Sequence, residues 1–75
     1  MSKVNDPRLK LGKAIRARRI ELGMSQEELA SRADIHVTYL SSVECGHRNV
    51  ALLNIIEIAQ SLGLLGSELF LKADI

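Results

Sequence analysis

The sequence has few of the residues that stabilise secreted proteins or stack on RNA bases. Cys45 is its single cysteine, so no disulfide can form within the chain. It has no tryptophan, one tyrosine and one phenylalanine, which argues against an RNA-stacking surface. It also shows no secretory signal and no apolar run long enough to span a bilayer. These absences predict a cytoplasmic protein that does not contact a membrane.

The chain is also short, and it is poor in metal-binding side chains. Its 75 residues predict one domain, residues 1–75, with a small apolar core. Structural zinc needs four ligands and a catalytic site needs an enclosed pocket, whereas the sequence offers only Cys45, His36 and His47 for such chemistry. We therefore expect no enzyme, no metal, no cofactor and no small-molecule ligand. We interpret Cys45 as a small, partly exposed side chain. Redox sensing by its thiol is a weaker alternative.

Positive charge is concentrated near the start of the chain. Residues 1–23 hold seven Lys or Arg against two acidic residues, a balance of +5, whereas residues 24–46 have a balance of −3 and residues 47–75 of −1. The net charge of +1 by itself says nothing about nucleic acid. The distribution predicts a basic first helix, and we expect four of the positive side chains in this part of the chain to be simply solvated: Lys3, Arg8, Lys10 and Lys13.

Residues 7–22 are predicted to form that first helix. Asp6 is its expected N-cap, Pro7 takes the first helical position, where a missing N–H costs nothing, and Gly23 ends the helix. Its main apolar stripe has helical spacing and consists of Leu11, Ala14, Ile15 and Leu22. Arg18 falls within this stripe, so we expect its aliphatic stem to cover apolar surface.

Two short helices joined by a tight turn follow in residues 25–45. Ser25 and Glu28 have the spacing of a capping box, in which each side chain bonds the other residue's backbone N–H. The first of these helices has an inward face of Leu29, Ala30 and Ala33. After a turn at residues 33–35, His36 is the expected N-cap of the second helix, whose inward residues are Leu40 and Val43. Neither helix is long enough to be stable unless it is packed.

The outward face of the second helix is small and neutral. It carries Thr38, Ser41, Ser42 and Cys45, flanked by Val37 and Tyr39. A solvent-facing helix in a small domain normally carries charge here, and this one has neither Lys nor outward Glu. Hydroxyl groups can bond base edges and a valine can touch a thymine methyl group. An ordinary solvated helix with small residues is the alternative interpretation.

Two more helices are predicted after Gly46. The first has an inward face of Leu52, Ile55, Ile56, Ala59 and Leu62 and ends at Gly63, which leaves Leu53 about 100° away from that face. The second covers about residues 66–71 and contains three consecutive large apolar residues, Leu69, Phe70 and Leu71. All three cannot point inward from one helix, so some must meet another subunit or stay exposed.

Residues at many separate positions of the chain resemble those of a known family. Residues 15–35, the stretch YLSSVE at 39–44, Gly46, Arg48-Asn49 and IAQSLG at 58–63 are similar to the helix-turn-helix domain of lambda-repressor and Cro-like (XRE) regulators. The resemblance covers roughly residues 8–71. It implies an all-α, compact five-helix bundle with the helix-turn-helix at about residues 25–45. The second helix of that motif is then expected in the major groove of double-stranded DNA.

The resemblance also implies roles for individual residues. Arg19 is expected to form a structural ion pair with Glu44, near the end of the recognition helix. Base contacts are expected from Val37, Thr38, Ser41 and Ser42. Phosphate contacts are expected from Gln26, Tyr39, His47 and Arg48, and such contacts fix the position of a protein on DNA without reading its sequence.

One recognition helix reads too few base pairs to find a single genomic site, so a homodimer on a palindromic operator is expected. The residues assigned to the dimer interface are Leu53, Leu69, Phe70 and Leu71. Within the family, a single domain with YLSSVE and Arg48-Asn49 is most similar to the controller proteins of restriction–modification systems, which regulate their own operon. Many members carry arginine where this chain has Val37. An antitoxin-type interaction module and a phage-type repressor are the alternatives.

Overall fold

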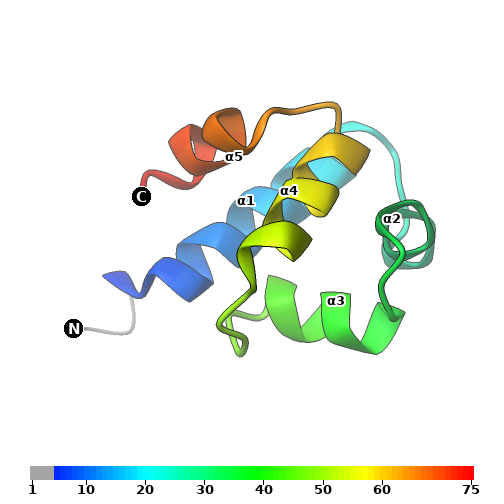
Figure 1. Ribbon diagram of the computed structural model, residues 1–75, viewed down its shortest axis with the longest axis horizontal. Coiled ribbons are helices and arrows are strands. Elements are labelled where there is room, and N and C mark those ends of the chain that lie inside the picture. The colour runs from blue at the N-terminus through cyan, green and yellow to red at the C-terminus, as the bar shows by residue number, and fades with distance from the viewer. Residues whose placement is uncertain (1–4) are drawn as a thin grey trace.

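The computed structural model describes residues 5–75, and in that range the chain forms five helices and no strand (Figure 1). The helices are α1 (Pro7–Glu21), α2 (Gln26–Ala33), α3 (Val37–Glu44), α4 (Leu52–Ser61) and α5 (Gly66–Ala73). The predicted all-α bundle is confirmed, and α2 and α3 form the helix-turn-helix within the predicted residues. Lys3, one of the cations predicted to face solvent, lies outside the described residues.

Local hydrogen bonds fix where α1 and α2 begin. The Asp6 carboxylate accepts from the Arg8 backbone N–H at 2.9 Å, and hydrogen bonding by the Arg8 side chain is the main reason that the pKa of Asp6 falls to about 2. Ser25 Oγ accepts from the Glu28 N–H at 3.0 Å, as predicted. The Glu28 carboxylate, however, pairs with Arg32 at 2.7 Å instead of closing the capping box. A cation one turn away offers Glu28 a better partner than the backbone of Ser25.

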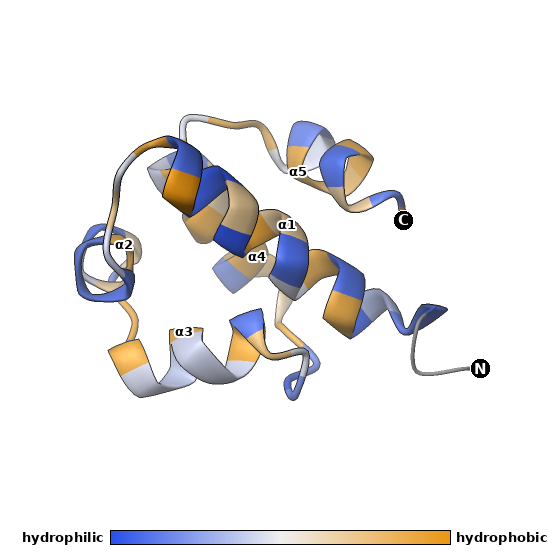
Figure 2. Ribbon diagram, turned by 180° about the vertical axis from the view of Figure 1, so that it is seen from behind, coloured by the Kyte–Doolittle hydropathy of each residue, from blue (hydrophilic) through white to orange (hydrophobic). Residues whose placement is uncertain are grey.

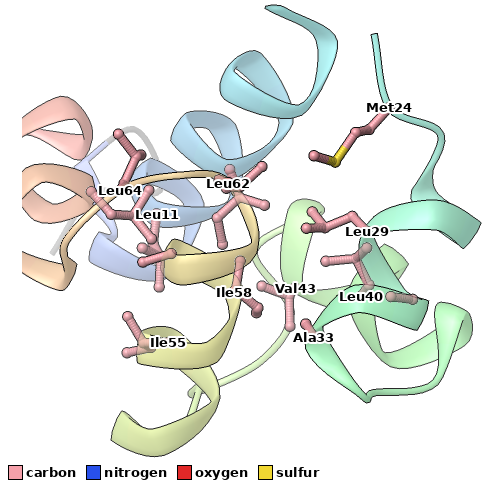
Figure 3. Close-up of a cluster of buried hydrophobic side chains, with 14 residues drawn as sticks. Leu11, Met24, Leu29, Ala33, Leu40, Val43, Ile55, Ile58, Leu62 and Leu64 are labelled. Atoms are coloured by element: carbon pink, nitrogen blue, oxygen red, sulfur yellow. The ribbon is translucent and has the colours of Figure 1, made fainter. Parts of the chain in front are cut away.

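One hydrophobic core joins all five helices (Figure 3). α1 packs against α3 and α5, α2 packs against α3 and α4, and α4 packs against α5. The buried side chains include most of the residues predicted to point inward: Leu11, Ile15, Leu29, Ala30, Ala33, Leu40, Val43, Ile55, Ala59 and Leu62. Removing these apolar side chains from water supplies the main driving force that holds α2 and α3 in place.

The inward face of α4 is rotated from the predicted one. Leu52, predicted to point inward, is 63% exposed, whereas Ile58 is fully buried. Leu52 is the first residue of α4, and the buried part of this helix begins one turn later. Leu22 was likewise predicted in the apolar stripe of α1 and is exposed, because α1 has ended there and Leu22 is its C-cap. Helical periodicity does not show how far along a helix its packing partners extend.

Arg18 connects α1 to the end of α4. Its Nε donates to the Leu62 carbonyl oxygen at 3.1 Å, and its Nη1 lies 3.6 Å from Glu21 Oε1. The last carbonyl groups of a helix lack partners within the helix, and a cation there is favourable. The half-buried Arg18 side chain therefore has a structural role that explains its position within the apolar stripe of α1.

α5 combines a core residue with exposed apolar residues. Leu69 is fully buried, Phe70 is half-buried against the core and Leu71 is 81% exposed. The prediction that these three residues cannot all point inward is confirmed. The assignment of Leu69 to a dimer interface is wrong, because this side chain lies inside the core of its own chain. Leu53 on α4 is 74% exposed and remains available on the surface.

α4 and α5 carry much of the apolar sequence of the chain, and Figure 2 shows hydrophobic segments on both helices and in the linker between them. No single helix within residues 5–75 is long and apolar enough to cross a membrane. α4 and α5 reach that length and composition only as a pair, across a bend of 92°. Part of their apolar surface belongs to the core, through Leu62 and Leu69.

Candidate nucleic-acid interface

Two glycines bring the end of α3 close to α1. At Gly12, within α1, a Cβ atom would lie 2.4 Å from the Val43 carbonyl oxygen and 2.6 Å from the Glu44 carbonyl oxygen. At Gly46, where φ is +78°, a Cβ atom would lie 2.8 Å from Leu9 Cα. Glycine is thus required at both positions for the two backbones to approach. The importance of Gly12 was missed, although a glycine inside a predicted helix often marks close packing.

A buried ion pair also ties α3 to α1. Arg19 Nε lies 2.8 Å from Glu44 Oε2, and Arg19 Nη2 donates to Glu44 Oε1 at 3.0 Å. The two side chains are 11% and 2% exposed, and Arg19 Nη1 donates to the Met24 carbonyl oxygen at 2.9 Å. Hydrogen bonding to Glu44 raises the pKa of Arg19, so the guanidinium stays charged. This is the bidentate geometry in which arginine and carboxylate interact most strongly.

Glu44 has a second partner at the start of α2. Gln26 Nε2 donates to Glu44 Oε1 at 3.0 Å, and the Gln26 side chain is half-buried. A carboxylate can only accept hydrogen bonds, so the amide nitrogen of Gln26 must face Glu44, and its second N–H is left for another acceptor. One carboxylate therefore links α1, α2 and α3. No local pattern predicts this contact, because Gln26 and Glu44 are 18 residues apart.

The outward face of α3 is small and uncharged. Val37 is 39% exposed, Thr38 is exposed, and Ser41 and Ser42 are half-buried. Glu44, the one charged residue of α3, turns inward. Figure 2 shows pale, near-neutral segments along this helix, in contrast to the strongly hydrophilic segments of α1. Such a face can approach base edges without removing a charged side chain from water.

Arg48 lies beside Tyr39 at the loop that follows α3. Its guanidinium carbon is 5.4 Å from the centre of the Tyr39 ring, within range of a cation–π interaction. The Tyr39 hydroxyl accepts a long hydrogen bond from Asn54 Nδ2 at 3.4 Å, which links it to α4. α4 itself begins after Ala51, which provides no side-chain cap, so its first N–H groups lack side-chain partners. An exposed cation next to an uncapped helix N-terminus favours an anion such as phosphate.

His36, Cys45 and His47 lie at the start of α3 and in the segment that follows it. His36 occupies the predicted N-cap position of α3, but its side chain makes no capping hydrogen bond. Cys45 and His47 line an open hollow between the start of α1 and the loop after α3. Across residues 5–75, no three His, Cys, Asp or Glu side chains are grouped so that they could hold a metal ion.

Comparison with known proteins adds independent evidence. A helix-turn-helix family profile matches residues 15–69. The control protein C.MunI of Mycoplasma sp is 41% identical over 68 residues, which cover 89% of this chain and 92% of that protein. The structure of the restriction–modification controller protein C.AhdI from Aeromonas hydrophila has a TM-score of 0.82 and 40% identity, covering 84% of this chain and 96% of that one. The controller protein C.Esp1396I, as a tetramer in complex with its natural 35 base-pair operator, has a TM-score of 0.83 and 28% identity, covering 91% and 90%.

The matched residues contain most of the interface described above, although Gly12 precedes them. They include the helix-turn-helix of α2 and α3, the loop that carries Arg48, and both members of the Arg19–Glu44 pair. The relatives also match over most of their own length, so the likeness is not confined to a short motif. The chain therefore belongs to the helix-turn-helix regulators of the lambda-repressor and Cro (XRE) type, and within them it is similar to the restriction–modification controller proteins.

Proposed function

We propose that the protein is a cytoplasmic regulator of transcription that binds a specific, imperfectly palindromic operator as a homodimer. In this proposal α3 enters the major groove. We assign base contacts to its outward residues Val37, Thr38, Ser41 and Ser42. We assign phosphate contacts to the side chains around it, namely Gln26, Tyr39, His47 and Arg48.

The outward face of α3 is the observation that carries this proposal. The face is uncharged and is exposed at Val37 and Thr38, while the opposite side of the same helix is fixed by the ion pair between Arg19 and Glu44. A rigid helix with small hydroxyl side chains suits the major groove better than it suits free solvent. The structure of C.Esp1396I in complex with its operator supports the same use of this fold.

The homodimer is proposed from the apolar surface of α4 and α5. Leu53 and Leu71 are mostly exposed, Leu65 in the linker is 67% exposed, and Phe70 is half-buried. Figure 1 shows α5 on the opposite side of the bundle from α3, so pairing through this surface would leave the reading face free. A two-fold axis there would place the two recognition helices about 34 Å apart, one turn of DNA.

Sedimentation of the free protein, with footprinting on operators of altered half-site spacing, tests this proposal. We expect a concentration-dependent dimer, because the interface is small, and binding that is lost when half a helical turn is inserted between the half-sites. A monomer at high micromolar concentration would contradict the dimer. Binding that is indifferent to half-site spacing would contradict the two-fold arrangement on DNA.

The regulated genes are proposed from similarity to the controller proteins. We propose that the protein controls a restriction–modification operon that includes its own gene. A reporter fused to the promoter of that gene should respond steeply to the protein level, since dimer formation depends on concentration. The Leu53→Ala variant changes the proposed dimer interface, so it should shift the reporter response to higher protein levels. A reporter that ignores the protein would contradict autoregulation.

A further inference from the structure

α3 lacks the side chains that recognise a base through paired hydrogen bonds. Guanine is usually read by Arg or Lys and adenine by Asn or Gln, each with two hydrogen bonds to one base edge. The sequence of α3 is VTYLSSVE, so its outward residues offer single hydroxyl groups and one valine. Single hydrogen bonds from these hydroxyl groups leave room for an apolar contact to add to the discrimination.

Val37 lies where an apolar side chain can contact the edge of a base. It is the first residue of α3, and the N-terminal residues of a recognition helix contact base edges. The core does not contain Val37, and a β-branched residue adds nothing to the stability of an exposed helical turn. Within the base edges of the major groove, the apolar group is the 5-methyl of thymine.

We propose that Val37 selects thymine through contact with its 5-methyl group, so that each operator half-site carries an A·T pair beneath the start of α3. This inference rests on the proposed DNA-binding function. It predicts a preference for thymine at this step, whereas an arginine in the same place would favour guanine.

The test uses duplexes selected by the purified protein from a fully randomised library. Each thymine of the selected operator is replaced by deoxyuridine, which removes only the 5-methyl group. Loss of one buried methyl predicts binding about fourfold weaker for one half-site and about 15-fold weaker for both. In Val37→Ala the same replacement should have almost no effect. Leu22→Ala is the matched control, because Leu22 is 42% exposed but lies at the far end of α1.

The outcomes separate this inference from the function on which it rests. A selected operator with no methyl-sensitive thymine, or equal sensitivity in Val37→Ala and the wild type, would overturn the role of Val37 and leave sequence-specific binding intact. A library that yields no preferred sequence would overturn both. Methyl sensitivity that Val37→Ala abolishes and Leu22→Ala keeps would support both.

A second inference comes from the hydrogen bond between Gln26 and Glu44. We infer that Glu44 is a positioning residue, which holds the Gln26 amide so that its free N–H faces the DNA backbone. Glu44 is 2% exposed in its side chain and is itself fixed by Arg19, so it can hold Gln26 in one orientation before DNA binds. Fixing a flexible side chain in advance lowers the entropy that binding must overcome.

A double-mutant cycle on DNA affinity tests this positioning role. Glu44→Gln should weaken binding about 3–10-fold more in the wild-type background than in the Gln26→Ala background, where only the loss of the ion pair with Arg19 remains. A purely structural Glu44 would weaken binding equally in both backgrounds, which would overturn the inference. Where Glu44→Gln does not fold, the Gln26 side-chain N–H signals of the wild-type protein decide by NMR. Slow exchange with water of the N–H proton that bonds Glu44 in the free protein supports positioning, whereas exchange as fast as in a fully exposed side-chain amide refutes it.

Discussion

The junction of α1 with α3 and the outer surface of α4 and α5 are built in opposite ways. At the junction, two glycines and a buried ion pair bring backbones and charges into fixed contact. On the outer surface, leucine side chains such as Leu53 and Leu71 face solvent. The first region holds α3 through contacts within one chain. The second is the surface through which we propose that another copy pairs.

The strongest test of the junction is the removal of the Glu44 carboxylate. Glu44→Ala leaves Arg19 nearly buried without its partner, and breaking a buried pair in this way costs about 3–5 kcal/mol of the free energy of unfolding. Chemical denaturation measures this loss. The double variant with Arg19→Ala should recover part of it, because the unpaired charge is then gone. A cost below about 1 kcal/mol, as for exposed pairs, would show that the junction does not depend on the ion pair.

Two leucines on α5 distinguish core from surface directly. Leu69→Ala should lower the free energy of unfolding by about 2–5 kcal/mol, since it empties a fully buried site. Leu71→Ala should change it by less than about 0.5 kcal/mol but weaken dimer formation. Denaturation and sedimentation of the same two variants measure both effects. Unchanged dimer formation in Leu71→Ala would exclude Leu71 from the interface.

The close approach of the α1 and α3 backbones at the junction can be tested without changing a charged residue. Gly12→Ala puts a methyl group against the carbonyl oxygens of Val43 and Glu44, and such overpacking costs about 1–3 kcal/mol. Gly23→Ala is the control, because a Cβ there meets nothing within 4 Å and only its φ of +70° is unfavourable. We expect Gly12→Ala to be the more destabilising variant by thermal unfolding. The reverse order would mean that α1 and α3 can separate easily.

Arg48 lies outside both regions, and its substitution tests the proposed phosphate contact. Arg48→Ala should weaken binding to every DNA sequence and reduce the salt dependence of affinity by about one counterion per monomer. Titrations of cognate and random duplexes over a range of salt concentrations measure both quantities. A loss confined to the cognate duplex would show that Arg48 reads bases.

Patterns within one helix predicted most of the fold. The caps Asp6 and Ser25 and the inward residues of α2 and α3 follow from local spacing, which the sequence contains. Contacts between helices were harder to predict. The apolar residues of α4 are compatible with several inward faces, and their spacing does not show whether a neighbouring helix covers Leu52. The same limit applies to Leu69, whose apolar character fits a core and an interface equally well.

The candidate site divides in the same way. The resemblance to the family implied that Arg19 and Glu44 would pair, because both residues lie at positions that match the family pattern. The hydrogen bond of Gln26 to Glu44 depends on how three helices meet, so a single sequence held no direct signal for it, whereas Gly12 inside a predicted helix was a signal that was missed. The DNA contacts are still predictions, since they depend on a partner outside the chain.

The affinity of Thr38→Ala for cognate and for random duplexes tests most directly the central claim, that the outward face of α3 reads bases. Thr38 is exposed and does not belong to the buried core, so the variant should fold normally. We predict a loss of about 1–3 kcal/mol of binding free energy on the cognate duplex and no change on random DNA. An equal loss on both duplexes, or no loss on either, would contradict this role for α3.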